Sequence, residues 1–278
     1  TGLYQRLLAE KTRPRADVFW NNEISRTLLL ARKGVLQPYT PETHKKVGSE
    51  FCAADRTWYG IACRVRVIIY NTEKVSRDEV PASIFDLRDA RWEGKVAMAY
   101  PLFGTTATHC AALRAHKAVG RKMANTFFKE LVANKIQIVE GNSVVARMVA
   151  DGRAEVGLTD TDDAWNMIDR GKPVKIVYPD QDLLGGQIGA LIIPNTASLI
   201  SGARHPRAAM KFLNFLLSAR AEAMLARAPS RHLPVRPAVP ADKDARALYE
   251  IRPMLVDWKI VAREVEAQAE DLRKIFPR

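Results

Sequence analysis

The sequence predicts an α/β fold with a largely parallel sheet, arranged in about two compact units. Between residues 95 and 178, short apolar segments rich in β-branched residues alternate with segments of helical periodicity. The chain has 278 residues, 47% hydrophobic and 27% charged, so each of about two units can bury a core of its own. The longest apolar runs fall far below the roughly 18 residues of a membrane span.

The predicted elements follow from local periodicity and from turn residues. A long alternating strand over residues 61–70 and a further strand over 189–194 flank the alternating block. The first ten residues predict an amphipathic helix rather than a signal peptide. The other predicted helices cover residues 22–33, 107–119, 121–134, 144–150, 163–169, 206–218 and 256–275, and the other predicted strands cover 17–20, 96–100, 136–140, 155–158 and 174–178.

The chain is basic, with 43 Lys and Arg against 31 Asp and Glu and a formal net charge of +12. Such an excess fits nucleic acid, an anionic membrane surface or an acidic ligand. The basic residues are scattered singly along the chain, and no nucleic-acid-binding motif accompanies them. We therefore predict a solvated basic surface, with neither nucleic acid nor a membrane as partner.

Polar residues follow three successive predicted strands, each just before a helix. Ligands of open α/β sheets bind at this edge, where helix N-termini offer free N–H groups to an anion or a polar ligand. The alternative is that these side chains only cap their helices. Three such junctions on one sheet favour a shared site, and its candidate residues are Gly104, Thr105, Thr106, Asn142, Ser143 and Asp160.

The third junction is unusually acidic. Asp160, Asp162 and Asp163 place three carboxylates within four residues, and their mutual repulsion calls for a cation, an arginine or water. An acidic pair at a helix start is electrostatically favourable in itself, so capping is again an alternative. The spacing excludes an EF-hand, because Trp165 occupies the sixth position of such a loop. A hard cation bound by these oxygens is the functional alternative.

No motif of an enzyme stands out. The sequence holds no phosphate-binding Walker loop, no GxGxxG, no GxSxG nucleophile elbow and no HExxH. The three cysteines lack metal-ligand spacing, and His109, on a predicted helix, is interpreted as a packing residue. We predict a protein without catalytic activity and without a resident cofactor.

Five segments, taken in order, carry a resemblance to a known family. They are 17–23 (DVFWNNE), 64–72 (RVRVIIYNT), 141–144 (GNSV), 157–160 (GLTD) and 194–195 (PN) with the following helix through 212–218 (FLNFLLS). Together they resemble the extracellular solute-binding proteins of ABC transporters, and within these the ferric-ion-binding branch. The resemblance extends over nearly the whole chain.

The resemblance implies a two-lobed, class II periplasmic-binding-protein fold that closes on its ligand by a hinge. Lobe 1 would hold residues 1–64 and 191–244, lobe 2 residues 65–190, and the C-terminal helices over 245–278 would pack on lobe 2. The first strand and helix of lobe 1 are expected to be absent from this chain. The implied function is the substrate-binding component of an ABC importer, a periplasmic monomer that captures a metal ion or small polar solute between its lobes and partners the permease subunits.

The resemblance also suggests the ligand residues. Iron-binding members use two adjacent tyrosines at the position of Asp162 and Asp163, and an acidic ligand where Asn22 or Glu23 falls. Glu23, Asp162 and Asp163 are therefore the predicted metal ligands, for Fe(III) or another hard cation. A small accompanying anion is expected near residues 104–106, Asn142 and Asp160, with Arg64 among the ligand-binding residues and Arg64 and Arg66 as counter-charges.

Two alternatives stay open at this point. A phosphorylated or amine-bearing organic solute would use the same helix N-termini and carboxylates. An enzyme or a regulatory effector domain on the same fold is the alternative from another class, since fold alone does not decide function. A regulator would need a helix-turn-helix segment, and an enzyme a nucleophile or base with its orienting partner; we find neither in the sequence.

Overall fold

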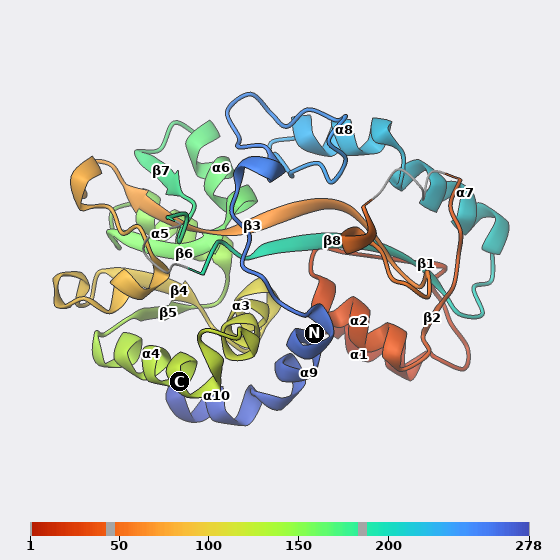
Figure 1. Ribbon diagram of the computed structural model, residues 1–278, viewed down its shortest axis with the longest axis horizontal. Helices are drawn as coiled ribbons and strands as arrows, with labels where there is room; N and C mark the ends of the chain where they lie inside the picture. Colours follow the sequence, from red (N-terminus) through yellow and green to blue (C-terminus); the bar gives the residue numbers. More distant parts are fainter. Residues whose placement is uncertain (1, 43–47, 183–187, 278) are drawn as a thin grey trace. The chain divides into compact units, whose positions relative to one another are not determined.

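The computed structural model describes residues 2–42, 48–182 and 188–277 (Figure 1). The chain forms two compact units. Unit 1 comprises Thr1–Arg64 and Ile193–Leu248, and unit 2 comprises Val65–Ile192 and Tyr249–Arg278. Within the described residues, no helix has the length and apolar character needed to cross a membrane.

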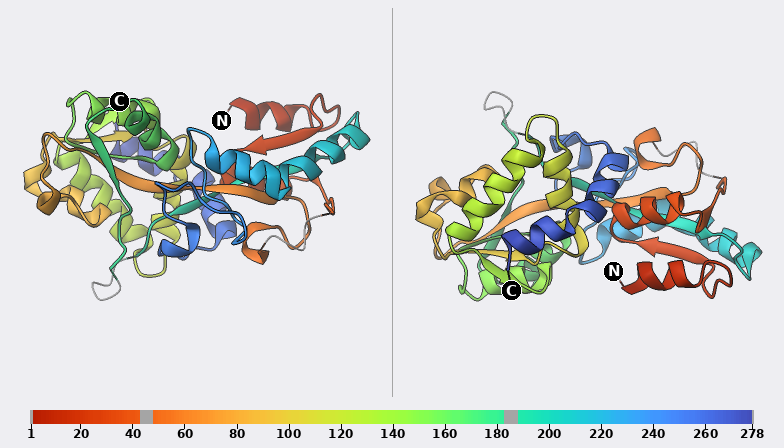
Figure 2. Two further views of the ribbon diagram at one scale, coloured as in Figure 1. Left: turned by 90° about the horizontal axis from the view of Figure 1, so that it is seen from above. Right: turned by 90° about the horizontal axis from the view of Figure 1, so that it is seen from below.

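Unit 1 is a small sheet with helices on both faces (Figures 1 and 2). Strand β8 pairs antiparallel with β1 and β2, in a register that sets Val18 opposite Leu199 and Leu36 opposite Ile200. The elements are α1 (Gly2–Ala9), β1 (Val18–Asn21), α2 (Ile24–Arg32), β2 (Leu36–Gln37), the first half of β3 (Tyr59–Asn71), β8 (Ile192–Ile200), α7 (Pro206–Leu216) and α8 (Ala219–Arg227).

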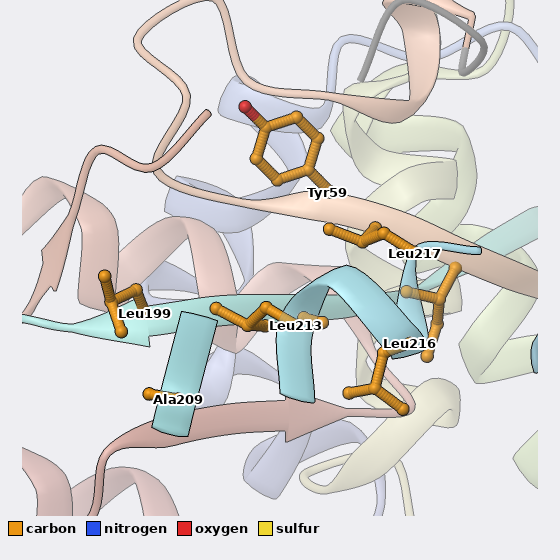
Figure 3. Packing of buried hydrophobic residues seen from close by; sticks show 8 residues of the cluster. Tyr59, Leu199, Ala209, Leu213, Leu216 and Leu217 are labelled. Carbon is orange, nitrogen blue, oxygen red and sulfur yellow. The ribbon is translucent and has the colours of Figure 1, made fainter. Parts of the chain in front are cut away.

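The core of unit 1 lies between α7 and the sheet (Figure 3). Alternate residues of β8 face opposite sides, so Ala197 and Leu199 pack towards α7 while Thr196 bonds Thr27 of α2, with 2.7 Å between the two hydroxyl oxygens. The apolar positions of α7 recur every three or four residues, as an amphipathic helix requires. Besides Ala197 and Leu199, the buried residues of this core are Ala209, Leu213 and Leu216 of α7, Leu217 directly after it, and Tyr59 and Ile61 of β3.

Among its described residues, unit 2 forms a five-stranded sheet flanked by helices. Strand β4 (Val96–Ala99) pairs in parallel with β5 (Gln137–Val139) and β6 (Val156–Asp160), and β3 lies between β6 and β7 (Val174–Val177), antiparallel to both. The helices are α3 (Gly104–Ala115), α4 (Gly120–Ala133), α5 (Asn142–Ala150), α6 (Thr161–Asp169), α9 (Trp258–Ala267) and α10 (Ala269–Ile275).

The prediction of a largely parallel sheet is therefore wrong for part of unit 2. Crossover helices between β4, β5 and β6 enforce parallel pairing of these strands. Strand β3 is followed instead by a connector with short 3-10 helices, the last of them Ala90–Trp92, so no crossover helix sets its direction.

Four further boundaries differ from the sequence-based expectation. The strand predicted at 189–194 begins at Ile192 and continues to Ile200, because Gly189 has a φ of +84° and Ala190 makes only an isolated bridge to Pro253. Helix α8 was not predicted, although the Ser218 side chain accepts a hydrogen bond from the Ala221 N–H and so caps it. The helix predicted over 256–275 is divided into α9 and α10 at Gln268, and α3 begins at Gly104 rather than at residue 107.

Candidate functional site

Three helices of unit 2 begin at the carboxyl ends of the parallel strands. Helix α3 follows β4, α5 follows β5 and α6 follows β6 directly. Because parallel strands end at one edge of a sheet, the first turns of these helices lie together. The structure accordingly brings together four of the candidate residues from the three junctions: Thr105, Thr106, Asn142 and Asp160.

Arg66 of β3 and Asp160 of β6 form the centre of this cluster. The register of the two strands places them directly opposite each other, and the Arg66 Nη1 to Asp160 Oδ1 distance is 2.9 Å. Both side chains are 1% exposed. Arg66 also donates to Asn142 Oδ1 at 3.1 Å and to the carbonyl of Leu158 at 3.4 Å. A buried charge needs such a set of partners, because burial alone is costly for it.

The second carboxylate oxygen of Asp160 is held by the other two helices. Thr105 Oγ1 of α3 donates to Asp160 Oδ2 at 2.6 Å, and Asn142 Nδ2 of α5 donates to the same oxygen at 2.9 Å. Asn142 Nδ2 also lies 2.7 Å from Thr105 Oγ1, and Thr106 Oγ1 donates to Asn142 Oδ1 at 3.1 Å. Asp160 therefore fastens the starts of α3 and α5 to β6 and is neutralised within the protein.

The same side chains do not cap their helices. None of α3, α5 and α6 has a side-chain hydrogen bond at its N-cap, which is Phe103, Gly141 and Asp160 respectively. The interpretation of these polar residues as helix caps is thus wrong, because their hydrogen bonds connect different elements. The backbone N–H groups of three helix starts remain directed to the same edge of the sheet.

Asp162 and Asp163 occupy the first turn of α6, next to this cluster. Both are half-buried, and one carboxylate oxygen from each, together with one from Asp160, lies within 4.8 Å of the others. Asp160 is the member of this group that pairs with Arg66 at hydrogen-bond distance. Three oxygens at such separations are compatible with one hard cation.

Of the remaining predicted site residues, Gly104 and Ser143 belong to unit 2, and Asn22, Glu23 and Arg64 belong to unit 1. Ser143 and Gly104 are exposed at the starts of α5 and α3, and Gly104 has a φ of +56°. In unit 1, Asn22 is exposed, and the carboxylate of Glu23 caps α2 by accepting hydrogen bonds from the N–H groups of Ser25 and Arg26. Arg64 is 8% exposed, with its Nη2 3.4 Å from His232 Nε2.

Two residues of the cluster escaped the sequence analysis. Thr159 Oγ1 donates to the Asn142 carbonyl at 3.0 Å, and Thr161 Oγ1 accepts from the Val65 N–H at 3.2 Å. Both threonines are fully buried. The signal was present, since two threonines flank Asp160 at the end of an otherwise apolar strand and a buried hydroxyl needs a partner.

His109 lies beneath the cluster on α3, with its Nδ1 3.5 Å from Arg66 Nε. Burial lowers the pKa of His109 from 6.5 to about 3; the positive charge of Arg66 adds to this effect, and the negative charge of Asp160 opposes it. The imidazole is therefore neutral in the folded protein, which agrees with its interpretation as a packing residue.

Acidification should destabilise the protein through His109. Between pH 6.5 and about pH 3, His109 is protonated in the unfolded chain but neutral in the folded protein. Stability is therefore lost as the pH falls through this window. Between about pH 7.5 and about pH 5.5, His109 should account for a loss of about 1.4 kcal/mol in the free energy of unfolding. Urea titrations of the wild type and of His109→Gln at both pH values measure this loss. His116→Gln is the control, because the pKa of His116 is lowered by partial burial alone. Equal pH dependence in wild type and His109→Gln would contradict the expectation.

Comparison with known proteins identifies the family. The profile of the bacterial extracellular solute-binding proteins matches residues 16–264. The chain belongs to this family. The family consists of bacterial extracellular solute-binding proteins, so the resemblance found in the sequence and the location outside the cytoplasm are confirmed.

Individual relatives of the family agree in fold. The structure of iron-bound HitA from Pseudomonas aeruginosa superposes with a TM-score of 0.85 at 26% identity, covering 98% of this chain and 87% of HitA. The predicted periplasmic-binding-protein fold is thereby confirmed.

Two curated relatives illustrate the range of ligands. Iron uptake protein A1 of Synechocystis is 25% identical over 260 residues, which is 90% of this chain and 70% of that protein. A putative 2-aminoethylphosphonate-binding periplasmic protein of Salmonella typhimurium is 27% identical over 278 residues, 98% of this chain and 79% of the relative. The match to the major ferric iron-binding protein of Neisseria meningitidis spans 62% of that protein.

Proposed function

We propose that this solute-binding protein is the substrate-binding component of an ABC importer and that it captures a hard metal cation of the ferric type. The observation that carries the proposal is the group of three carboxylates from Asp160, Asp162 and Asp163 within 4.8 Å of one another. Closure on the ligand, delivery to the permease subunits and action as a monomer in the periplasm are parts of the same proposal.

The charge balance of the site favours a positive ligand. Arg66 neutralises Asp160, and the N-terminus of α6 favours about half an elementary charge of opposite sign. Asp162 and Asp163 add two further carboxylates in the first turn of α6. Carboxylate oxygens are the ligands that hard cations prefer, and a bound cation would relieve their repulsion.

The relatives support iron as the first cation to test. Iron uptake protein A1 and iron-bound HitA are both similar to this chain over at least 90% of its length. The resemblance places two tyrosines where this chain has Asp162 and Asp163. Carboxylates discriminate less than phenolates between Fe(III) and other hard cations, so we propose a site of broader metal selectivity.

Replacing both Asp162 and Asp163 by asparagine should weaken metal binding at least about tenfold, or roughly 1.4 kcal/mol. Asparagine keeps the size and the capping ability of aspartate, so the melting temperature of the metal-free protein should barely change. Calorimetric titration with Fe(III) supplied as its citrate complex, followed by metal analysis, measures the effect. Asp78→Asn, in an exposed 3-10 turn of unit 2, is the matched control.

The opposite pattern would refute this role of the acidic pair. Unchanged affinity together with a lower melting temperature would mean that Asp162 and Asp163 serve only the start of α6. If Asp78→Asn also lost affinity, the effect would come from the net charge of the protein and not from the acidic pair.

A second candidate ligand is an amine-bearing phosphonate, favoured by the uncapped starts of α3, α5 and α6. Their N–H groups suit a phosphonate, while Asp162 and Asp163 suit an amine. The similarity to a putative 2-aminoethylphosphonate-binding protein, over 98% of this chain, points in the same direction. Titration with 2-aminoethylphosphonate in the presence of a chelator separates the two ligands. Saturable binding without metal would show that the phosphonate, rather than iron, is the transported solute.

A further inference from the structure

Basic residues that are isolated in the sequence gather at one end of unit 1. Three segments meet there: residues 11–17 after α1, residues 32–34 at the end of α2, and residues 201–207, the turn after β8 with the first residues of α7. A β-carbon on Gly202 would lie 3.5 Å from the Pro14 ring, and one on Gly34 would lie 3.6 Å from Lys11 Nζ, so the turns touch one another. Both views of Figure 2 show the turn after α1 and the turn before α7 at the same end of the unit.

This group of turns is strongly positive. Its exposed cations are Lys11, Arg13, Arg15, Arg32, Lys33, Arg204 and Arg207, against a single carboxylate, that of Asp17. Asp17 is engaged by His205, whose backbone N and Nδ1 lie 3.0 and 2.9 Å from its two oxygens. Glu10, just outside the turns, is paired with Arg6 at 2.9 Å. Seven cations therefore face solvent with little internal compensation.

Exposed aromatic side chains adjoin the positive turns. Phe212 and Phe215 of α7 are 43% and 42% exposed. Trp20 of β1, 44% exposed, contacts Phe212 edge-on, with ring centroids 6.5 Å apart. Arg207 and Lys211, also exposed, lie on the same helix. Exposed cations and aromatic rings thus occur together on α7, and we name these residues, with Trp20 and the positive turns, the basic aromatic face.

We propose that the basic aromatic face docks unit 1 onto an anionic lipid bilayer. Charge complementarity argues for this occupant, since lysine and arginine near an anionic leaflet each contribute a favourable term. Tryptophan and phenylalanine are the side chains that enter the headgroup region, which a purely electrostatic contact with an acidic protein would not require. The face would hold the protein near the membrane that carries its transporter, whichever solute it binds.

Vesicle sedimentation with the full chain tests this face directly. Wild type should bind vesicles rich in phosphatidylglycerol, fail to bind phosphatidylcholine vesicles, and dissociate as the salt concentration rises, because the cations are exposed. The triple variant Arg13→Glu, Arg15→Glu and Arg204→Glu should lower the partition coefficient at least about 30-fold. Trp20→Phe should abolish the quenching of tryptophan fluorescence by brominated lipid while preserving most of the binding.

A matched charge reversal separates this face from the overall charge. Lys122→Glu, Lys129→Glu and Arg170→Glu change the net charge equally on exposed positions of unit 2, and this variant should keep binding within about threefold of wild type. Equal losses in both triple variants would overturn the proposal, and so would absence of wild-type binding to phosphatidylglycerol. Absence of binding to phosphatidylglycerol would indicate that the basic aromatic face binds an acidic protein instead. Solute affinity, measured in parallel, should be unchanged in either variant.

Discussion

Replacing Arg66 by leucine should lower the free energy of unfolding by about 3–5 kcal/mol, because it leaves the carboxylate of Asp160 buried without its cation. Both partners are 1% exposed, so water cannot substitute for the guanidinium. The loss should extend beyond the ion pair, since Arg66 also donates to Asn142 at the start of α5 and to the Leu158 carbonyl. Chemical denaturation followed by circular dichroism measures it.

A second substitution should recover much of this loss. Combining Arg66→Leu with Asp160→Leu removes both charges, and replacement of a buried pair by apolar residues is often close to neutral. Arg88→Leu, which breaks an exposed pair with Glu130 at 3.0 Å, should cost no more than about 1 kcal/mol. If Arg66→Leu were as mild as Arg88→Leu, the central role assigned to Arg66 in this cluster would be wrong.

The Arg66–Asp160 pair shows where the sequence stops being informative. Hydrophobic periodicity predicted both strands and the three strand-to-helix junctions, because these patterns are local. Which of Asp160, Asp162 and Asp163 would be neutralised depends on the register of β3 against β6, across 94 residues of chain. From the sequence, Arg64 and Arg66 are equally good candidates for the counter-charge. Only the pairing of strands selects Arg66.

The basic aromatic face illustrates the same limit at the surface. The absence of long charge runs predicted no membrane partner, because the segment Val65–Ile192 of unit 2 lies between Arg15 and Arg204 in the sequence. The antiparallel pairing of β1 with β8 brings the turns before and after these strands together. Likewise, the apolar residues of the predicted helix over 206–218 include Phe212, but those of α7 that are buried against the sheet are Ala209, Leu213 and Leu216. The width of a buried stripe depends on the partner surface, which a helix sequence does not contain.

Gly189→Ala should destabilise the protein by at least about 3 kcal/mol, the range reached by backbone strain combined with overpacking. Gly189 has a φ of +84°, and a β-carbon there would lie 2.5 Å from both the carbonyl carbon and oxygen of Pro253. These are backbone atoms, and they are fixed on either side, because the Ala190 N–H donates to Arg252 at 3.0 Å and the Met254 N–H donates to Ala190 at 2.8 Å. The contact cannot relax by rotating a side chain.

Gly94→Ala separates the two contributions to this effect. Gly94 has a similar φ of +68°, but a β-carbon there would meet no atom within 4 Å, so its cost should be only the roughly 1–2 kcal/mol of a left-handed residue. A difference of more than about 1 kcal/mol between the variants would measure the clash with Pro253. Equal losses in thermal and chemical unfolding would show that the clash relaxes. If Gly189→Ala is the more damaging, the extra loss of stability measures the contact between Gly189 and Pro253, which precedes the segment with α9 and α10. This segment packs on unit 2, where the Gln268 side chain donates to the Ala107 carbonyl at 2.7 Å and so stabilises α3, the helix that carries Thr105.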